Sequence, residues 1–446
     1  MALDWVDGLL IFLGLLGAYA GIVYALYRAG RIGPERALSL FGPALMVKTR
    51  RGRGWLDRVG RFRRFWSRVS DVGLLLAGVA MVVIVGTLIW EGVLVTQIPA
   101  SAAPSPQEAL ALPGLNPVIP LGYGLVAIVV GIVLHELAHG IVARSQGVGV
   151  RSLGILWFVV PVGAFVEQEE QEMRDAPRRV RGRIAAAGIL ANFGLAVLFF
   201  TVCSLLVSTS VHPNANGAGV EAVLGGSPAA NASIAPGDII TSVNGTATPN
   251  NQALFDALAK TTGGETIPLT YYSAHLGTSE SIRLTLSPSP YTPGRGYLGV
   301  GIAPVSTGQF VGILSSPLTS SNGPLAGGVT WIILPLAGLS PIAGPTTSFF
   351  HLTGAGAALG STGFWVTVNL LYWLSWMNLL LGLSNALPLV PLDGGLLYRD
   401  FVTSALARLR RGWDAATLDG VAGRLSVLTS LFVVFLLAWQ FIAPRL

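Results

Sequence analysis

The chain has 446 residues, of which 52% are hydrophobic and only 11% are charged. A soluble protein of this length usually carries about a quarter charged residues, so the composition excludes an ordinary soluble enzyme and predicts a polytopic α-helical membrane protein. The formal net charge of +6 is concentrated in a few segments, and the single cysteine, Cys203, excludes an intrachain disulfide.

Six apolar segments approach or exceed the roughly 20 residues that a helix needs to cross the hydrocarbon core of a bilayer. In chain order they are 8–27, 72–95, 121–143, 184–207, 364–387 and 422–442. Two shorter apolar stretches, 153–166 and 326–345, contain prolines and are interpreted as re-entrant or interfacial pieces, the first of them β-rich. Irregular backbone at membrane depth must be covered by protein or line a wet cavity.

Basic segments set the expected orientation, because cytoplasmic loops are enriched in Lys and Arg. Three such segments, 28–70, 174–183 and 399–411, fall on one side of a six-span map. With these in the cytoplasm, both termini and the polar stretch 209–310 lie outside. The residues between Lys48 and Arg68 include nine Lys or Arg interleaved with apolar residues at helical spacing. This pattern favours a basic amphipathic helix on anionic lipid over a solvated loop or a nucleic-acid partner.

The third span contains the stretch GIVLHELAHG, in which His135 and His139 are four residues apart on one helix face with Glu136 beside them. In an H-E-x-x-H helix two imidazoles bind zinc and the glutamate activates a water molecule. The alternative is that the histidines only form hydrogen bonds across a helix bundle. Ionisable groups at membrane depth are costly and usually functional, so the sequence predicts one zinc ion per chain.

A third ligand is required, because a catalytic zinc site usually has three protein ligands. The candidate is Asp393 in NALPLVPLDGG, residues 385–395, where prolines and glycines interrupt a helix near the membrane boundary. An ordinary turn at a helix end is the alternative reading. If residues 326–345 do not cross the membrane, Asp393 returns to the same face as His139.

These motifs together resemble the site-2 protease family of intramembrane zinc metalloproteases over about residues 120 to 445. NALPLVPLDGG is similar to the family's N-x-x-P-x-x-x-L-D-G pattern, and Gly188 and Asn192 are similar to its Gly-x-x-x-Asn element, although Ile189 replaces a frequent proline. The resemblance implies cleavage within or near transmembrane segments of single-span membrane proteins or signal-peptide remnants. Glu136 is then the catalytic base, and Asn192 and Asn385 are candidates for binding substrate or the oxyanion, or for bonding between helices.

The polar stretch resembles a PDZ domain of the kind found in membrane proteases. Residues 226–245, GSPAANASIAPGDIITSVNG, and the stretch RGYLGV that includes Leu298, Gly299 and Val300 carry the resemblance. It implies capture of an extended peptide as an added strand. A domain that only excludes large substrates is the equal alternative.

The expected architecture is therefore about six transmembrane helices with a re-entrant β segment and an extramembrane α+β PDZ-like domain. Its parts are an N-terminal pair of spans with the basic segment (1–118), a first part of the catalytic core (119–208), the PDZ-like domain (209–305) and a second part of the core (306–446). The active site is expected near the cytoplasmic face of a prokaryotic cell membrane. Two other functions stay open, which are an inactive scaffold that binds peptides and a metal-linked transporter.

Overall fold

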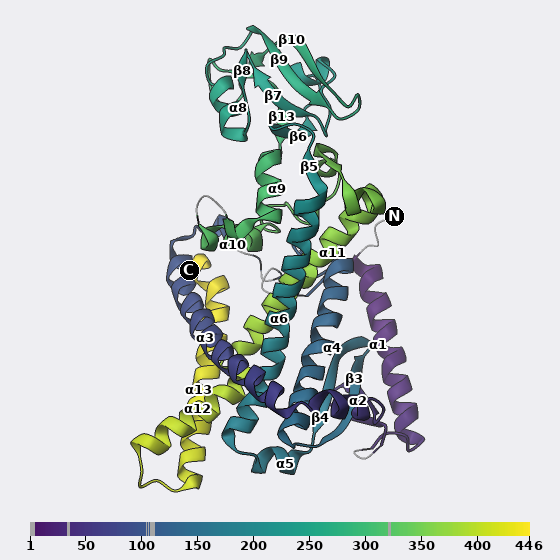
Figure 1. The fold of residues 1–446 in the computed structure, drawn as a ribbon, viewed down its shortest axis with the longest axis vertical. Helices are drawn as coiled ribbons and strands as arrows, with labels where there is room; N and C mark the ends of the chain where they lie inside the picture. The colour runs from purple at the N-terminus through teal and green to yellow at the C-terminus, as the bar shows by residue number, and fades with distance from the viewer. Residues whose placement is uncertain (1–4, 34–35, 104, 106, 108–111, 320–322) are drawn as a thin grey trace. The chain divides into compact units, whose positions relative to one another are not determined.

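The computed structural model describes the whole chain except residues 1–4, 34–35, 104, 106, 108–111 and 320–322 (Figure 1). The chain divides into two compact units made of interleaved segments. The first comprises residues 1–110, 125–196 and 377–446, and the second comprises residues 111–124 and 197–376. The domain boundaries expected from the sequence, at 118, 208 and 305, stay predictions.

Five of the predicted spans are confirmed as helices that are long and apolar enough to cross a membrane. They lie within α3 (Arg63–Leu94), α4 (Leu121–Gln146), α6 (Arg178–Ser210), α11 (Gly354–Ala386) and α13 (Ala415–Ile442). Gly360, with a φ of 70°, interrupts α11 before the predicted span begins. These five helices support an integral membrane protein.

The first predicted span, 8–27, lies in helix α1 (Trp5–Arg28). Its part Leu13–Arg28 is apolar but, at 10–17 residues, shorter than a full span. The sixth transmembrane helix therefore stays a prediction.

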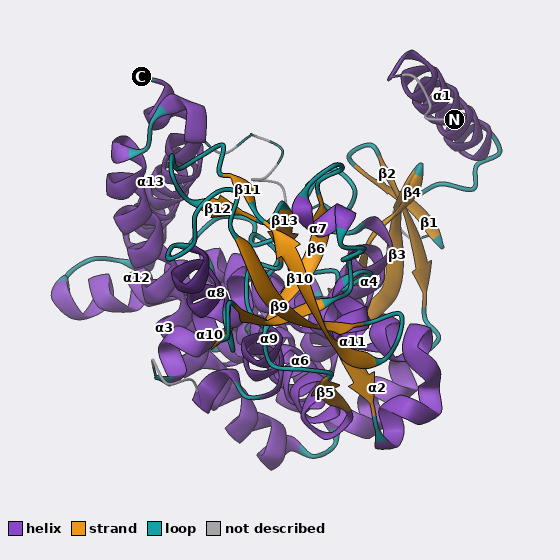
Figure 2. Ribbon diagram, turned by 90° about the horizontal axis from the view of Figure 1, so that it is seen from above, coloured by secondary structure: helices purple, strands orange, loops and turns teal. Residues whose placement is uncertain are grey.

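A four-stranded antiparallel sheet in the first unit joins two distant parts of the sequence. Its strands run in the order β1 (Leu38–Phe41), β2 (Ala44–Thr49), β3 (Val150–Phe158) and β4 (Val160–Gln168). Figure 2 shows these four strands as one group. The prediction of a β-rich piece at 153–166 agrees with the β3–β4 hairpin. Strands β1 and β2, within the basic segment, were not predicted. They form because β3 supplies a partner for β2, with Val47 opposite Ile155.

The basic segment also contains helix α2 (Arg53–Gly60), followed by the start of α3. Leu56 of α2 is fully buried and belongs to a core cluster with Ile141 and Val142 of α4. A Cβ atom on Gly60 would lie 3.0 Å from the Ile141 carbonyl oxygen, so glycine permits this close approach. The single amphipathic helix predicted for residues 48–68 is therefore found only in part: helical structure starts at Arg53 and breaks between Gly60 and Arg63. One face of α2 packs on the helix that carries the histidines.

Small side chains bring α3 against α6 and the end of α11. The buried cluster there contains only alanines and one isoleucine, namely Ala77, Ala80, Ala186, Ile189 and Ala386. Small residues let membrane helices approach closely where no hydrophobic effect drives them together. Asp71 of α3 adds ion pairs with Arg179 (2.9 Å) and Arg183 (2.8 Å) of α6. The N-terminal helix α3 is thus an integral part of the first unit.

The proline-containing stretch 326–345 forms only the short helix α10 (Pro324–Ile333), followed by turns. Ten residues rise about 15 Å, which is half of the hydrocarbon thickness. This agrees with the prediction that the stretch is not a full span.

The second unit contains a separate sheet with the strand order β10–β9–β7–β6–β13, and β8 pairs with β7. Its strands are β6 (Ala218–Val223), β7 (Ile239–Val243), β8 (Thr246–Ala247), β9 (Thr266–Ser273), β10 (Thr278–Thr285) and β13 (Val300–Ile302), with helices α7 (Pro228–Asn231) and α8 (Asn251–Leu258). Its core includes the fully buried Ile240 and Leu269. The buried carboxylate of Asp238 accepts hydrogen bonds from the Ala235 and Ala274 amides (2.9 Å each), which fixes the Pro236-Gly237-Asp238 turn.

The second unit also contains the end of α6, the larger part of α11 and several short elements. Strands β5 (Val211–Pro213) and β14 (Phe350–Leu352) pair, and helix α9 (Thr307–Ser315) begins at a Ser306 capping box. A capping box satisfies two amides at a helix start.

Candidate metal centre

Helix α4 presents two imidazoles on one buried face. His135 and His139 are each only 7% exposed. The ligand atoms of His135, Glu136 and His139 all lie within 4.8 Å of one another. The four-residue spacing accounts for this, because residues i and i+4 lie one turn apart on a helix.

Asp393 reaches these histidines from a distant part of the chain. It is the first residue of α12 (Asp393–Leu409), and its Oδ2 lies 3.2 Å from Nε2 of His135 and 3.2 Å from Nε2 of His139. The two glycines after it permit a tight loop. A Cβ on Gly394 would lie 2.3 Å from the Leu387 carbonyl oxygen, and one on Gly395 would lie 2.7 Å from that of Leu389.

The three ligand atoms fit a zinc ion. The two Nε2 atoms are 3.0 Å apart, so the triangle has sides of 3.0, 3.2 and 3.2 Å. Tetrahedral ligands at about 2.0–2.1 Å from zinc are roughly 3.3 Å apart. In addition, Asp393 Oδ2 is a buried oxygen without a hydrogen-bond partner among the described residues. A buried polar atom of this kind requires an explanation, and a metal ion would supply one.

Asp393 is held as a carboxylate. Burial raises the pKa of Asp393, but hydrogen bonds and positive charge from the protonated imidazoles of His139 and His135 outweigh burial, so its pKa lies well below the usual range. The group is therefore ionised at neutral pH, which is the state in which it binds a cation.

Each imidazole is oriented by a contact of its second ring nitrogen, Nδ1. His139 Nδ1 lies 2.7 Å from the Ile184 carbonyl oxygen, which can only accept a hydrogen bond. The proton of neutral His139 is therefore on Nδ1, and the Nε2 lone pair faces Asp393. Ligating histidines in proteins usually make such a second hydrogen bond.

At Nδ1 of His135 the corresponding partner is a side chain, that of Asn192. Asn192 Nδ2 lies 3.1 Å from His135 Nδ1, and Asn192 Oδ1 is buried without a partner. Turning the amide by half a rotation would exchange the two atoms, so that Oδ1 accepts from an Nδ1–H. That arrangement satisfies the orphaned oxygen and leaves Nε2 of His135 free to bind metal.

Gly188 lies one turn before Asn192 on α6 and leaves room for both imidazoles. A Cβ atom there would lie 2.5 Å from Nε2 of His135 and 2.5 Å from Nε2 of His139. Any larger residue would displace the ligands. The Gly-x-x-x-Asn element thus serves the site in two ways: Gly188 leaves space for the imidazoles, and Asn192 provides an amide beside His135.

Glu136 lies beside an edge strand. Its Oε2 accepts a hydrogen bond of 3.0 Å from the Val166 amide of β4. Among the described strands, β4 pairs only with β3, which leaves its other edge open to this contact. The carboxylate is thereby positioned by backbone and is half-buried rather than sealed in the core.

The structure does not bring Asn385 to the three ligands by any hydrogen bond in the described part of the chain. Its Nδ2 donates to the Leu381 carbonyl (3.0 Å), one turn earlier in α11. Leu298, Gly299 and Val300 lie in the second unit, where Val300 pairs with Val223 and the Gly299 carbonyl accepts from the Leu224 amide (2.9 Å).

A model described as Peptidase family M50 matches residues 123–417, which is most of the chain. The chain belongs to peptidase family M50. This is the site-2 protease family, so membership supports a membrane metallopeptidase at the level of the family. The matched segment contains all three ligand candidates and Glu136.

Two relatives of this M50 protein match it over most of their own lengths. An uncharacterised protein of Methanocaldococcus jannaschii is 26% identical over 353 residues, which are 78% of this chain and 75% of that protein. A Nostoc protein, provisionally named a zinc metalloprotease, is 27% identical over 318 residues, which are 60% of this chain and 81% of that protein. Membership of family M50 and the name of the Nostoc protein both imply that the buried histidine group binds zinc.

Two contacts of this M50 site were not predicted from the sequence. They are the Ile184 carbonyl that accepts from His139 and the Val166 amide that donates to Glu136. Both are backbone groups, which every residue has, so no side-chain motif could have marked them.

Proposed function

We propose that this M50 protein is a zinc-dependent intramembrane endopeptidase of the site-2 type. The observation that carries the proposal is the approach of Asp393 to both histidines beside Glu136, within a unit of long apolar helices. Its substrates are single-span membrane proteins or signal-peptide remnants, cut within or near their transmembrane segments. The site faces the cytoplasm, and the PDZ-like domain lies outside.

The chain's own residues divide the chemistry between them. A bound zinc ion would supply Lewis acidity to a water molecule and to the scissile carbonyl. His135, His139 and Asp393 would hold that ion. Glu136 takes a proton from the attacking water and returns it to the leaving amine. The Val166 amide holds Glu136 Oε2, which fixes where the proton is accepted.

Asn192 is proposed as a residue that positions His135 rather than as an oxyanion donor. Replacing it with leucine removes the amide beside His135 Nδ1, whereas Asn192→Asp keeps a hydrogen-bond acceptor there. We expect Asn192→Leu to weaken zinc affinity about 10- to 100-fold and Asn192→Asp to retain most of it, measured by competition with a zinc chelator. Unchanged zinc affinity together with loss of activity in both variants would support an oxyanion role instead.

Strand β4 is proposed to bind the substrate as an added strand. Val166 directs its amide outward to Glu136, and successive residues of a strand alternate, so Ala164 also faces the free edge. The register between Leu153–Val166 and Ile155–Ala164 is unbroken. A substrate paired here would lie extended beside Glu136, as peptide hydrolysis requires.

Replacing Ala164 with proline tests this pairing. Proline removes the outward amide, and an edge strand tolerates it. Loss of one backbone hydrogen bond is expected to lower kcat/KM about tenfold with zinc content unchanged. Ala164→Val keeps the amide and is the matched control. Equal kcat/KM values in the proline and valine variants would argue against strand addition.

The PDZ-like domain is proposed to bind a peptide terminus. Strand β13 is the last strand of its sheet, and a groove of about 680 Å³ lies along it. The groove is lined by residues of β13, of the RGYLGV stretch and of α8, including Leu254, Phe255 and Leu258. An edge strand facing an apolar helix is the arrangement in which strand addition gives affinity and pockets give specificity.

Binding of a fluorescent peptide with an apolar C-terminal residue tests the groove. Phe255 is 55% exposed and lines it, so Phe255→Asp is expected to abolish measurable binding by fluorescence anisotropy. Leu276, 59% exposed and outside the groove, gives the control Leu276→Asp. An amidated peptide that binds as well as the free carboxylate would contradict terminus recognition, and binding by neither peptide would favour the filter role.

A further inference from the structure

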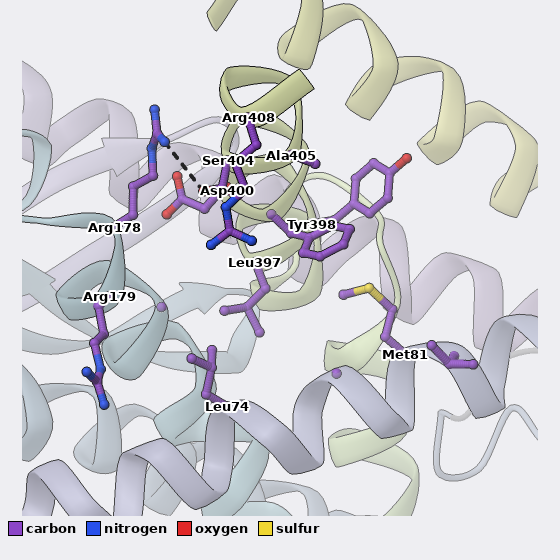
Figure 3. Close-up of a pocket in the computed structure, with 14 residues that line it drawn as sticks. Leu74, Met81, Arg178, Arg179, Leu397, Tyr398, Asp400, Ser404, Ala405 and Arg408 are labelled. Carbon is purple, nitrogen blue, oxygen red and sulfur yellow. Dashed lines mark hydrogen bonds between the residues drawn. The ribbon is translucent and has the colours of Figure 1, made fainter. Parts of the chain in front are cut away.

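A cavity in the first unit lies apart from the metal ligands. Its volume is about 550 Å³, and α3, the start of α6 and α12 line it. Figure 3 shows Arg178 of α6 with Ser404 and Arg408 of α12 around one part of the cavity, and Leu74 and Met81 of α3 along another. The cavity therefore has a polar end and an apolar wall.

The polar end carries uncompensated positive charge. Three arginines and one aspartate line the cavity. Asp400 is already paired with Arg181 at 2.5 Å, and Arg179 with Asp71 at 2.9 Å. Arg178 donates only to the Ser404 hydroxyl (3.4 Å), and neither Arg178 nor Arg408 has an ion-pair partner within the described part of the chain. Two guanidinium groups are thus available to an anion.

The apolar wall runs along a membrane-spanning helix. Leu74, Gly78 and Val82 of α3 line the cavity, and the eight steps from residue 74 to residue 82 rise about 12 Å along the helix. Val82 is 73% exposed and Phe401 on the α12 side is 71% exposed. A Cβ atom on Gly78 would meet nothing within 4 Å, so this stretch of wall is open rather than filled.

The depth of the two ends follows from the helix lengths. Helix α6 has 33 residues, which is about 50 Å, whereas the hydrocarbon core is about 30 Å thick. The arginines of α6 precede its apolar run, which begins at about residue 184. Its first turn, with Arg178, is therefore placed at the level of the lipid head groups, and the wall on α3 extends from there into the acyl region.

We propose that this cavity binds an anionic phospholipid, with the phosphate between Arg178 and Arg408 and one acyl chain along Leu74, Gly78 and Val82. Arginine binds phosphate oxygens with two parallel hydrogen bonds, and basic pockets between transmembrane helices bind anionic head groups. A free phosphate ion would use the arginines but not the wall. The site is independent of the proposed peptidase activity.

Native mass spectrometry of the full chain in detergent tests the proposal with defined lipids. The wild type is expected to retain phosphatidylglycerol and to release phosphatidylcholine. Arg178→Gln and Arg408→Gln should each weaken phosphatidylglycerol retention about fivefold, since one cation near an anionic head group contributes about that factor. Arg411→Gln, outside the cavity, is the charge-matched control and should change nothing.

A second variant tests the acyl wall separately. Gly78→Leu adds a side chain at a position where a Cβ meets nothing within 4 Å and should abolish retention. Gly86→Leu is the control on the same helix, because a Cβ there also meets nothing within 4 Å. Equal retention of both lipids would overturn the head-group assignment. If inorganic phosphate displaced the lipid and Gly78→Leu had no effect, the cavity would be a phosphate site and the lipid proposal would be wrong.

Discussion

Replacing Asp393 with alanine is expected to remove most of the zinc from the purified protein. The wild type should contain about one zinc per chain, because three ligand atoms 3.0–3.2 Å apart match a tetrahedral site with one open position. Without Asp393 only two imidazoles remain as protein ligands. A water molecule carries no negative charge and cannot replace the buried carboxylate. His139→Ala should have the same effect. Metal content is measured by elemental analysis after dialysis against a weak chelator.

The control for Asp393→Ala is Asp419→Ala. Asp419 is exposed and pairs with Arg399 on the surface, an interaction of small energy, so this variant should keep its zinc and its thermal unfolding midpoint. Zinc content that stays at the wild-type level in Asp393→Ala would show that the third ligand lies elsewhere. A wild type that binds no zinc would leave the histidines as a feature of helix packing.

The second large effect is expected from Glu136→Gln. Glutamine keeps the size of the side chain and an oxygen to accept from the Val166 amide, but it cannot take a proton from water. We expect kcat for a transmembrane substrate to fall about 10²- to 10⁴-fold, the usual contribution of a general base. Zinc content should stay at the wild-type level, because Glu136 is not one of the three ligand candidates.

The comparison of zinc content and cleavage separates the candidate functions. An inactive scaffold would lose nothing on Glu136→Gln, and its peptide binding would still depend on Phe255. A metal-linked transporter would retain ion flux in liposomes. Cleavage lost with zinc retained is expected only of a peptidase in which Glu136 moves the proton.

The sequence determined those parts of the site that depend on local periodicity. The spacing of His135 and His139 places both on one face of any helix, and the apolar run around them makes a helix at membrane depth the expected structure. The proline- and glycine-rich stretch around Asp393 likewise marked a break in helical structure. The resemblance to a family then joined the two motifs, which local rules could not do.

Only the tertiary structure decided how distant segments meet. From the sequence alone, Asn192 could contact the substrate or another helix. Its 3.1 Å contact with His135 favours a role in positioning that metal-ligand candidate. The pairing of β2 with β3 was not predicted, because a short strand in a basic segment forms only when a partner strand lies beside it. Contacts that depend on backbone amides and carbonyls, such as those of Val166 and Ile184, leave no signal in the identity of the residues.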